Sequence, residues 1–412
     1  MDGIVILGAG QAGIQLASTL REMSYGGPIH MVGDEPVAPY QRPPLSKAFL
    51  SGATPEAALF MQEPDFFAKH DIRFMPSTEA QSVDRELKQV NLKSGNRLPY
   101  DHLVFATGAR NRALPCAPDA RPGVISLRTL EDSKMLAKGL EAAANIVIIG
   151  AGFLGLEAAT VAAAAGRDVR VIEAGPRPLG RAVTEPVSEV VRRCHHEQGV
   201  RFDFDETVVA LHGKGVHDHA LETRSGERIK ADLVLVSVGV TPNTELAAAA
   251  GLPVDNGIVV NEVLLTEDPA ISAIGDCAAF PFAADGGRMV RVESVQNAVD
   301  QARCVAERLV GKPAAYDQVP TFWSDQAGLR LQMAGLAMAG DRAVVRGDPT
   351  SKAFSVFCYR GDRLVAVESV SRPPDYMLGR RLLRAGISPT PGQAADSSVD
   401  LKALLAASKT VA

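Results

Sequence analysis

The chain has 412 residues, of which 46% are hydrophobic and 22% are charged, and its formal net charge is −5. This composition is ordinary for a folded globular protein, and the length suits two or three domains. The acidic balance argues against binding to nucleic acid or to a membrane surface. Residues 320–412 hold 12 Lys/Arg against 8 Asp/Glu, so residues 1–319 carry a net charge of −9. A basic C-terminal region favours an acidic partner.

Cysteine usage and hydrophobic patterning bear on location. The most apolar stretch, residues 146–166, contains Glu157 and several glycines, which predicts a strand, a turn and a helix and not a membrane span. None of the five cysteines lies within three residues of another, and the eight histidines show no metal-ligand spacing. With no secretory leader ahead of the first apolar run, these features predict a cytoplasmic protein that binds no metal.

The first predicted element is a β-branched strand, IVIL, that runs into a G-x-G-x-x-G turn and an apolar helix. Asp34 and Glu35 end the next strand, about 20 residues beyond the turn, where an acid can bond ribose hydroxyls. Glycines let the backbone approach a pyrophosphate, and the helix N-terminus stabilises its charge. The predicted dinucleotide site therefore includes three glycines, which are Gly8, Gly10 and Gly13.

The same device returns 142 residues later as IVIIGAGFLG, with Glu173 at the end of the following strand. An acid at that position accepts bonds from an unphosphorylated ribose and repels a 2′-phosphate, so it favours NADH over NADPH. Arg177 and Arg181 follow closely and offer a phosphate an alternative partner. Two fingerprints predict two dinucleotides, and the natural redox partner of a nicotinamide is a flavin. The second set of glycines is Gly150, Gly152 and Gly155.

The repeat extends beyond the fingerprints, because KSGNRLPYDHLVFATG and RSGERIKADLVLVSVG both read as a hairpin followed by an apolar strand ending at glycine. Asp101 and Asp232 precede those two strands. The predicted fold class is α/β, with two Rossmann-like doubly wound domains and an α+β C-terminal domain. We expect a discontinuous FAD-binding domain over 1–109 and 240–319, an NAD-binding domain over 110–239, and the C-terminal domain over 320–412.

Seven segments together resemble one family: ILGAGQAG, YQRPPLSK, LVFATGARNRALP, IGAGFLGLE, AIGDCA, RVESVQNA and FWSDQ. They occur in the order found in the putidaredoxin reductase-like, FAD-dependent NADH–ferredoxin reductases that are coupled to oxygenases. The resemblance covers nearly the whole chain and looks closest to members that serve haem-thiolate monooxygenases. It implies that a hydride from NADH is taken up on FAD and that single electrons pass to a [2Fe–2S] ferredoxin.

The resemblance also implies a set of FAD contacts. Besides the first three glycines and the acids at 34 and 35, the matching positions are Ala12, Arg42, Lys47, Ala80, Thr107, Gly108, Arg128, Asp276 and Val295. Ala80 and Val295 would contribute backbone, and Asp276 would bond the ribitol hydroxyls. A carboxylate placed just after a strand and a glycine supports the last assignment on its own. Asp276 as a helix N-cap and Arg128 as a surface ion-pair partner are the alternatives.

Three residues are predicted to act in catalysis. The family pattern has Glu157 bonding the nicotinamide amide and pairing with Lys47, with Trp323 lining the flavin–nicotinamide cleft. We place Glu157 in the first turn of its helix, where the alternative is a surface acid favoured by the helix dipole. Trp323, the one tryptophan, has the alternative of a packing residue. The chemistry depends on positioning, because hydride transfer abstracts no proton from carbon.

The cysteine positions narrow the reaction. Disulfide reductases of this fold need a cysteine pair at the flavin, and NADH oxidases and peroxidases need one reactive cysteine there, so the electrons must go to an external acceptor. An acidic [2Fe–2S] ferredoxin suits the basic C-terminal region, where the candidate docking residues are Arg380, Arg381 and Arg384. The alternatives are a rubredoxin reductase and an apoptosis-inducing-factor-like redox sensor. We expect a monomer or a weak homodimer.

Overall fold

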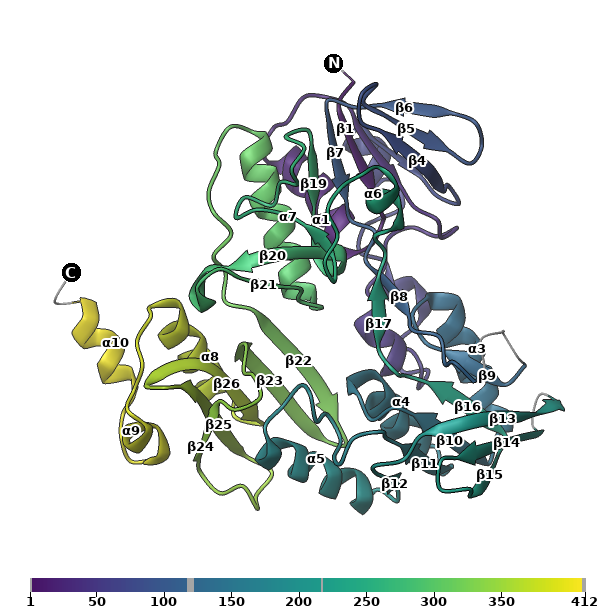
Figure 1. Cartoon of the computed structure of the whole chain (residues 1–412), viewed down its shortest axis with the longest axis vertical. Coiled ribbons are helices and arrows are strands. Elements are labelled where there is room, and N and C mark those ends of the chain that lie inside the picture. Colours follow the sequence, from purple (N-terminus) through teal and green to yellow (C-terminus); the bar gives the residue numbers. More distant parts are fainter. Residues whose placement is uncertain (1, 117–121, 216–217, 410–412) are drawn as a thin grey trace. The chain divides into compact units, whose positions relative to one another are not determined.

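The computed structural model describes residues 2–116, 122–215 and 218–409, and it divides the chain into two compact units (Figure 1). The first unit comprises Met1–Gln41, Glu56–Arg110 and Val240–Gln318. The second comprises Arg42–Pro55, Asn111–Gly239 and Val319–Ala412. The C-terminal region thus belongs to the same unit as the predicted NAD-binding region, and the short segment 42–55 belongs to that unit too. The three predicted domain boundaries remain a prediction.

The first unit is built on a five-stranded parallel sheet in the order β19-β7-β1-β2-β3. Helices α1 (Gln11–Glu22) and α7 (Val295–Leu309) pack against each other beside it (Figure 1). Its central strand is buried at every residue, as the apolar run IVIL predicts. The strands are β1 (Ile4–Leu7), β2 (Ile29–Val32), β3 (Ile72–Met75), β7 (His102–Phe105) and β19 (Ile271–Ala273).

The second unit repeats this arrangement with a parallel sheet in the order β12-β11-β10-β16-β9. The two predicted aspartates, Asp101 and Asp232, make equivalent hydrogen bonds, each within its own repeat. Asp101 Oδ2 accepts the Gly3 N–H at 2.8 Å, and Asp232 Oδ2 accepts the Asn145 N–H at 2.8 Å. Each carboxylate therefore anchors the chain just before or at the start of the central strand of its sheet. The strands are β9 (Val124–Ser126), β10 (Asn145–Ile149), β11 (Asp168–Ile172), β12 (Arg201–Asp203) and β16 (Leu233–Val236).

Both predicted hairpins form three-stranded antiparallel sheets, β4-β5-β6 in the first unit and β13-β14-β15 in the second. Gly95 (φ +87°) and Gly226 (φ +87°) occupy the tight turns, where the left-handed backbone favours glycine. The strands are β4 (Ala80–Asp84), β5 (Gln89–Leu92), β6 (Arg97–Pro99), β13 (Val208–Gly215), β14 (Asp218–Thr223) and β15 (Arg228–Ala231).

The C-terminal region forms an antiparallel sheet in the order β22-β23-β26-β25-β24. Leu382 of α8 packs into its core with Phe357 and Val367. The Arg346 guanidinium donates to the carbonyls of Ala394, Asp396 and Val399 and so fixes the chain after α9. The elements are β22 (Thr321–Gln326), β23 (Leu329–Gly335), β24 (Arg342–Arg346), β25 (Phe354–Arg360), β26 (Arg363–Val370), α8 (Pro373–Arg384), α9 (Pro391–Ala395) and α10 (Lys402–Lys409).

The remaining elements cover or connect these sheets. In the second unit they are η1 (Pro43–Ser46), α3 (Leu130–Ala142), α4 (Phe153–Ala164) and α5 (Glu185–Glu197). In the first unit they are η2 (Glu56–Leu59), α2 (Phe66–Lys69), α6 (Glu245–Ala249), β18 (Ile258–Val259), η3 (Gly275–Cys277), β20 (Ala278–Phe282), η4 (Ala283–Asp285) and β21 (Arg288–Val290). Strands β8 (Ala109–Asn111) and β17 (Val240–Pro242) lie where the chain leaves and re-enters the first unit.

None of the helices that the structure describes combines the length and the apolar character needed to cross a membrane. Over the same residues, no cluster of three or more His, Cys, Asp and Glu side chains could hold a metal ion.

One buried histidine makes the first unit sensitive to acid. Burial, aided by the nearby Arg308 guanidinium, lowers the pKa of His102 from 6.5 to about 3. Between about pH 6.5 and pH 3 the His102 side chain is therefore protonated in the unfolded chain and neutral in the folded chain. The free energy of unfolding consequently falls as the pH drops below about 6.5. Between pH 7 and pH 5, His102 should reduce the free energy of unfolding by about 2 kcal/mol.

Urea denaturation at pH 7 and pH 5 measures this effect. Between the two pH values, the free energy of unfolding of a His102→Gln variant should fall by about 2 kcal/mol less than that of the parent chain. His70 is exposed, so His70→Gln is the matched control and should lose as much as the parent. Equal losses in all three proteins would show that His102 is protonated in the folded state.

Candidate functional site

The first glycine loop has the shape that a pyrophosphate needs. Gly8 (φ +117°) lies so close to the neighbouring strand that an added Cβ would meet the Ala106 carbonyl oxygen at 2.1 Å. A Cβ on Gly10, in contrast, would meet no atom within 4 Å. Gly10 is the N-cap of α1, and as a glycine it has no side chain that could bond the first N–H groups of the helix. The loop thus offers open space in front of an uncapped helix N-terminus, which fits an anionic diphosphate.

The second glycine loop repeats these features. A Cβ on Gly150 (φ +101°) would meet the Ser237 carbonyl oxygen at 2.3 Å, and a Cβ on Gly155 would meet the Gly150 carbonyl oxygen at 2.5 Å. Gly152 again faces open space and caps α4 without a side-chain bond. The repeat is therefore one of local backbone geometry as well as of sequence, and both loops fit a dinucleotide.

The acids of the first fingerprint differ in their surroundings. Asp34 is exposed, whereas Glu35 is half-buried and accepts the Tyr40 hydroxyl at 2.6 Å. Further along the same unit, Thr107 Oγ1 donates to the Asn243 carbonyl at 2.6 Å, and the Asn243 amide donates to the Thr107 carbonyl at 2.9 Å. Asn243 therefore holds the Thr107-Gly108 turn. Sequence analysis missed Asn243, which carries no motif and lies far away along the chain.

The other predicted FAD positions divide between the two units. Asp276 lies in η3 and is half-buried, and Val295 is the first residue of α7. Ser294 caps α7 by accepting the Asn297 N–H, so Asp276 is not the cap of that helix. Ala12 lies buried in α1, and Ala80 begins β4. In the second unit, the Arg42 guanidinium donates to the Arg128 carbonyl at 2.6 Å.

Glu173 is held beside the second glycine loop. One carboxylate oxygen accepts the Ala151 N–H at 2.7 Å, and the other accepts the Gly175 N–H at 2.8 Å. Arg177, a possible partner for a 2′-phosphate, donates instead to the carbonyls of Gly180 and Val183, both at 3.0 Å. Arg181 is exposed. A negative charge beside the loop, with Arg177 engaged elsewhere, favours an unphosphorylated ribose.

Lys47 and Glu157 form an ion pair in the second unit. Lys47 Nζ lies 2.6 Å from Glu157 Oε2, and the carboxylate is 6% exposed. Ser46 donates its hydroxyl to the same oxygen at 2.5 Å, and Ser324 donates to Oε1. Lys47 also donates to the Pro43 carbonyl at 3.2 Å. Among the described residues these contacts use two of the three ammonium donors, which leaves one for a ligand.

The helix register corrects one expectation. Helix α4 begins at Phe153, so Glu157 lies beyond its first turn and is buried, not a surface acid beside the helix N-terminus. A buried carboxylate needs partners because desolvation is unfavourable for its charge. The segment YQRPPLSK supplies them: its two prolines start η1, and the Leu45 carbonyl accepts the Ser133 hydroxyl of α3 at 2.7 Å. This stiff corner places Ser46 and Lys47 against the helix.

Trp323 lies on the opposite face of β22 from the residues that reach α4. Side chains alternate along a strand, so Phe322, Ser324 and Gln326 share one face and Trp323 takes the other. Phe322 contacts Phe153 with ring centroids 4.5 Å apart, which identifies the shared face as the one against α4. Trp323 is half-buried. Its catalytic role, like those of Lys47 and Glu157, stays a prediction.

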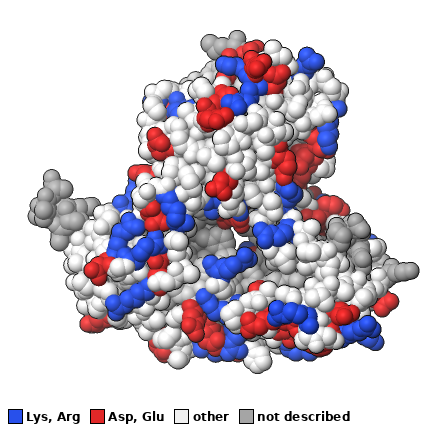
Figure 2. Space-filling view, viewed as in Figure 1, with Lys and Arg blue, Asp and Glu red and all other residues white. Residues whose placement is uncertain are grey.

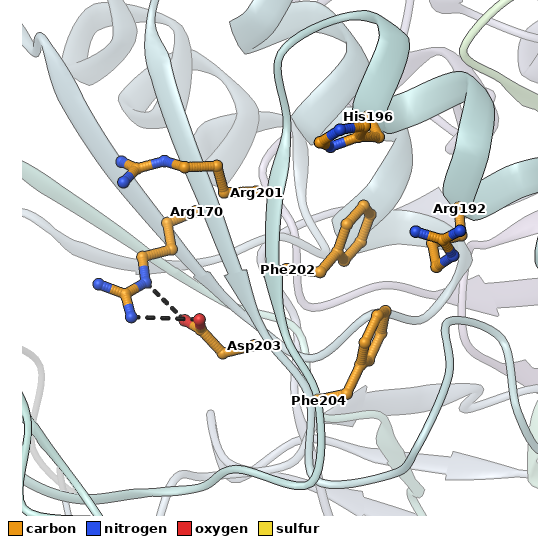
Figure 3. A pocket seen from close by; sticks show the side chains of 7 residues that line it. All are labelled: Arg170, Arg192, His196, Arg201, Phe202, Asp203 and Phe204. Atoms are coloured by element: carbon orange, nitrogen blue, oxygen red, sulfur yellow. Dashed lines mark hydrogen bonds and ion pairs between the residues drawn. The ribbon is translucent and has the colours of Figure 1, made fainter.

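A cavity of about 520 Å³ opens beside the edge strand β12, and its lining is rich in arginine (Figure 3). Each of these arginines is neutralised by a carboxylate: Arg170 by Asp203 and Glu227, Arg192 by Glu189, and Arg201 by Asp168. Phe202 and Phe204 stack along its wall. In its own sheet, strand β11 separates β12 from β10, the strand that leads into the second glycine loop. The paired charges of the cavity suit the surface of a sheet edge better than a nucleotide.

The five cysteines are free thiols, and four of them are buried. Cys277 lies next to Asp276, but its thiol donates to the Ile274 carbonyl, and burial raises its pKa. Burial also raises the pKa of Cys304 to about 11. A buried thiol with a raised pKa is a poor nucleophile.

Comparison with known proteins identifies the family. Residues 2–302 match the model of the pyridine nucleotide-disulphide oxidoreductases. The chain belongs to this family. Residues 321–405 match the reductase C-terminal domain, which accounts for the antiparallel sheet that follows the two dinucleotide-binding regions. The predicted fold class and family are therefore confirmed.

Reductases of rhodocoxin, ferredoxin and putidaredoxin are similar to this chain over nearly its whole length. Rhodocoxin reductase from Rhodococcus erythropolis is 46% identical over 98% of this chain and 95% of its own. The ferredoxin reductase for the CYP199A2 system of Rhodopseudomonas palustris superimposes with a TM-score of 0.94 at 44% identity, over 98% of this chain and 99% of its own. The covalent putidaredoxin reductase–putidaredoxin complex gives 0.95 at 40% identity, over 99% of both chains.

The ion pair yields a kinetic prediction. Glu157→Gln and Lys47→Ala should each slow the reduction of bound FAD by NADH by roughly tenfold to a hundredfold, because each would remove a charge that we predict to lie beside the reacting groups. FAD retention should stay within about threefold, since other residues are expected to hold the pyrophosphate. Stopped-flow absorbance measures the first quantity and ultrafiltration the second. Lys138→Ala, an exposed change on α3, is the control, and equal rates in all four proteins would refute the assignment.

Glu173 yields a second prediction. The parent chain should show a kcat/KM for NADH at least about tenfold above that for NADPH, because the carboxylate repels a 2′-phosphate. Glu173→Ser should reduce that ratio, mainly by improving the KM for NADPH. Steady-state assays with both nucleotides decide the matter, and a parent chain that prefers NADPH would contradict the reading of this site.

Proposed function

We propose that this chain is an FAD-dependent NADH:ferredoxin reductase that supplies electrons to an oxygenase. The observation that carries the proposal is the pair of glycine loops, each with open space before the start of a helix. It is combined with an ion pair between Lys47 and the buried carboxylate of Glu157, and with four buried cysteines. The relatives named above support it, since each is a reductase of a small electron carrier. FAD, when bound, supplies a centre that accepts a hydride and releases electrons singly.

The residues of the chain have distinct tasks in this proposal. Gly10 and Gly152 leave room for the two diphosphates, and Glu173 selects the ribose of NADH. Glu157 orients the nicotinamide through its carboxamide, and Lys47 places a positive charge where negative charge develops. Trp323 closes the cleft. The free cysteines agree with a reducing compartment, so a cytoplasmic location is part of the proposal.

Helix α8 is the proposed docking surface for an acidic ferredoxin. Arg381 and Arg384 are exposed and three residues apart, and Met377, one turn earlier, is 46% exposed. Arg380 is half-buried. Figure 2 shows several Lys and Arg side chains gathered on the part of this face where Figure 1 labels α8. Arginine and methionine are enriched in protein interfaces, and positive charge speeds encounter with an acidic partner.

The choice of acceptor tests the proposal. With NADH, cytochrome c reduction should depend on an added [2Fe–2S] ferredoxin and should remain at least about tenfold slower with a rubredoxin. Arg381→Glu with Arg384→Glu should raise the KM for ferredoxin by about tenfold at low salt, and the effect should shrink with added salt because screening weakens surface charges.

Arg228 is an exposed arginine of β15, so Arg228→Glu is the matched control and should leave the KM for ferredoxin unchanged. Reduction of FAD by NADH should be the same in all variants. Equal turnover with rubredoxin would favour a rubredoxin reductase, and a reduced flavin that persists with both carriers would favour a redox sensor.

A further inference from the structure

A chain of buried polar side chains extends from Glu157 into the C-terminal sheet. Ser324 and Gln326 of β22 and His195 of α5 are each fully buried. Gln326 Nε2 lies 2.7 Å from Ser324 Oγ, and Gln326 Oε1 lies 3.2 Å from His195 Nε2. Together with the Ser324–Glu157 bond, these contacts join four side chains from three elements of the second unit.

The hydrogen bonds of this chain all have the same direction, and a backbone carbonyl sets it. Gln326 Nε2 lies 3.2 Å from the Phe153 carbonyl oxygen, which can only accept a hydrogen bond. The amide nitrogen must therefore face Phe153 and Ser324, and the amide oxygen must face His195. It follows that His195 Nε2 carries a proton and donates it to Gln326.

The direction of the Gln326 amide also fixes the direction of the hydrogen bond between Ser324 and the Glu157 carboxylate. Because Ser324 Oγ accepts the amide N–H of Gln326, its own proton is free to bond Glu157 Oε1. Each link is then a donor aimed toward Glu157, and successive hydrogen bonds of this kind polarise and strengthen one another. Ser46 and Lys47 complete the set on the second oxygen.

The far end of the chain agrees with a neutral histidine. His195 Nδ1 has no hydrogen-bond partner in the described structure, which suits an unprotonated ring nitrogen. The ring packs edge-on against Phe202, with centroids 6.2 Å apart. Burial lowers the pKa of His195 to about 4, so the ring is uncharged near neutral pH.

We propose that Ser324, Gln326 and His195 are positioning residues that hold the Glu157 carboxylate in the orientation needed for hydride transfer from NADH. The proposal rests on the proposed function, and it assigns the FWSDQ segment a role that Trp323 alone does not explain. Strand β22 would act through Glu157, so the C-terminal sheet would tune the nicotinamide site besides presenting a docking surface.

The tautomer of His195 provides a test that needs no activity. In ¹⁵N-histidine NMR of the FAD-loaded protein at pH 7.5, His195 should appear as the neutral Nε2–H tautomer with an unbonded Nδ1. A His195→Gln spectrum assigns the signal by its loss. An Nδ1–H tautomer, which leaves Nε2 without a proton, would overturn the directional chain, and a charged ring would contradict the neutral histidine at its far end.

Stopped-flow reduction by NADH provides the second test. Ser324→Ala should lower the limiting rate of FAD reduction by about tenfold, because it removes a donor to the Glu157 carboxylate itself. His195→Leu should lower it by about threefold, because His195 acts through two intervening side chains, and both variants should change the apparent Kd for NADH less. His195→Gln keeps a donor near the Nε2 position and should restore the parent rate.

Ser355→Ala is the matched control, because Ser355 is an equally buried serine of the same sheet that bonds Ser369 and Asp375 instead. It should leave the limiting rate unchanged. Parent-like rates in Ser324→Ala and His195→Leu, or an equal loss in Ser355→Ala, would overturn the positioning role. If NADH fails to reduce the flavin of the parent protein, the proposed function is wrong. The NMR measurement of the His195 tautomer does not depend on activity, so it still tests the direction of the hydrogen bonds.

Discussion

The buried carboxylate of Glu157 is the constraint on which the organisation of the second unit depends. At 6% exposure it needs strong partners, because an unpaired charge in the interior is costly by several kcal/mol. Those partners come from the η1 corner and from β22, regions more than 100 residues away in either direction along the chain. Satisfying one carboxylate thus requires the corner, helix α4 and the C-terminal sheet to form together, which explains why segment 42–55 groups with the second unit.

The two glycine loops have the same backbone geometry. In each, the first glycine avoids a carbonyl of the neighbouring strand and the second faces open space before an uncapped helix. These requirements are local, since they involve a strand, a turn and the start of a helix. Asp101 and Asp232 add a matching hydrogen bond at the start of the central strand of each sheet. The repeat therefore preserves the features that bind and anchor, while the loops and the C-terminal sheet differ.

The surroundings of the Lys47–Glu157 ion pair favour one kind of reaction. Lys47 is partly exposed and keeps a donor for a ligand, whereas four of the five cysteines are buried. Burial raises the pKa of Cys277 and of Cys304, so a positioned charge beside poorly reactive buried thiols suits electron transfer to another protein. The exposed arginines and methionine of α8 belong to the same unit, so the proposed roles of entry and exit of electrons draw on one structural body.

The amino-acid sequence by itself determined the fold class and both fingerprints, because glycine spacing and strand patterning are properties of short segments. The family and the pairing of Lys47 with Glu157 were predicted from the resemblance that the ordered motifs carry. It placed Glu157 one turn too early in α4, since helix starts depend on a few backbone bonds. Only the tertiary structure revealed Asn243 holding the Thr107 turn and the chain from His195 to Ser324. Asn243 and His195 carry no motif and lie far along the chain from the residues that they contact, so packing decides those contacts.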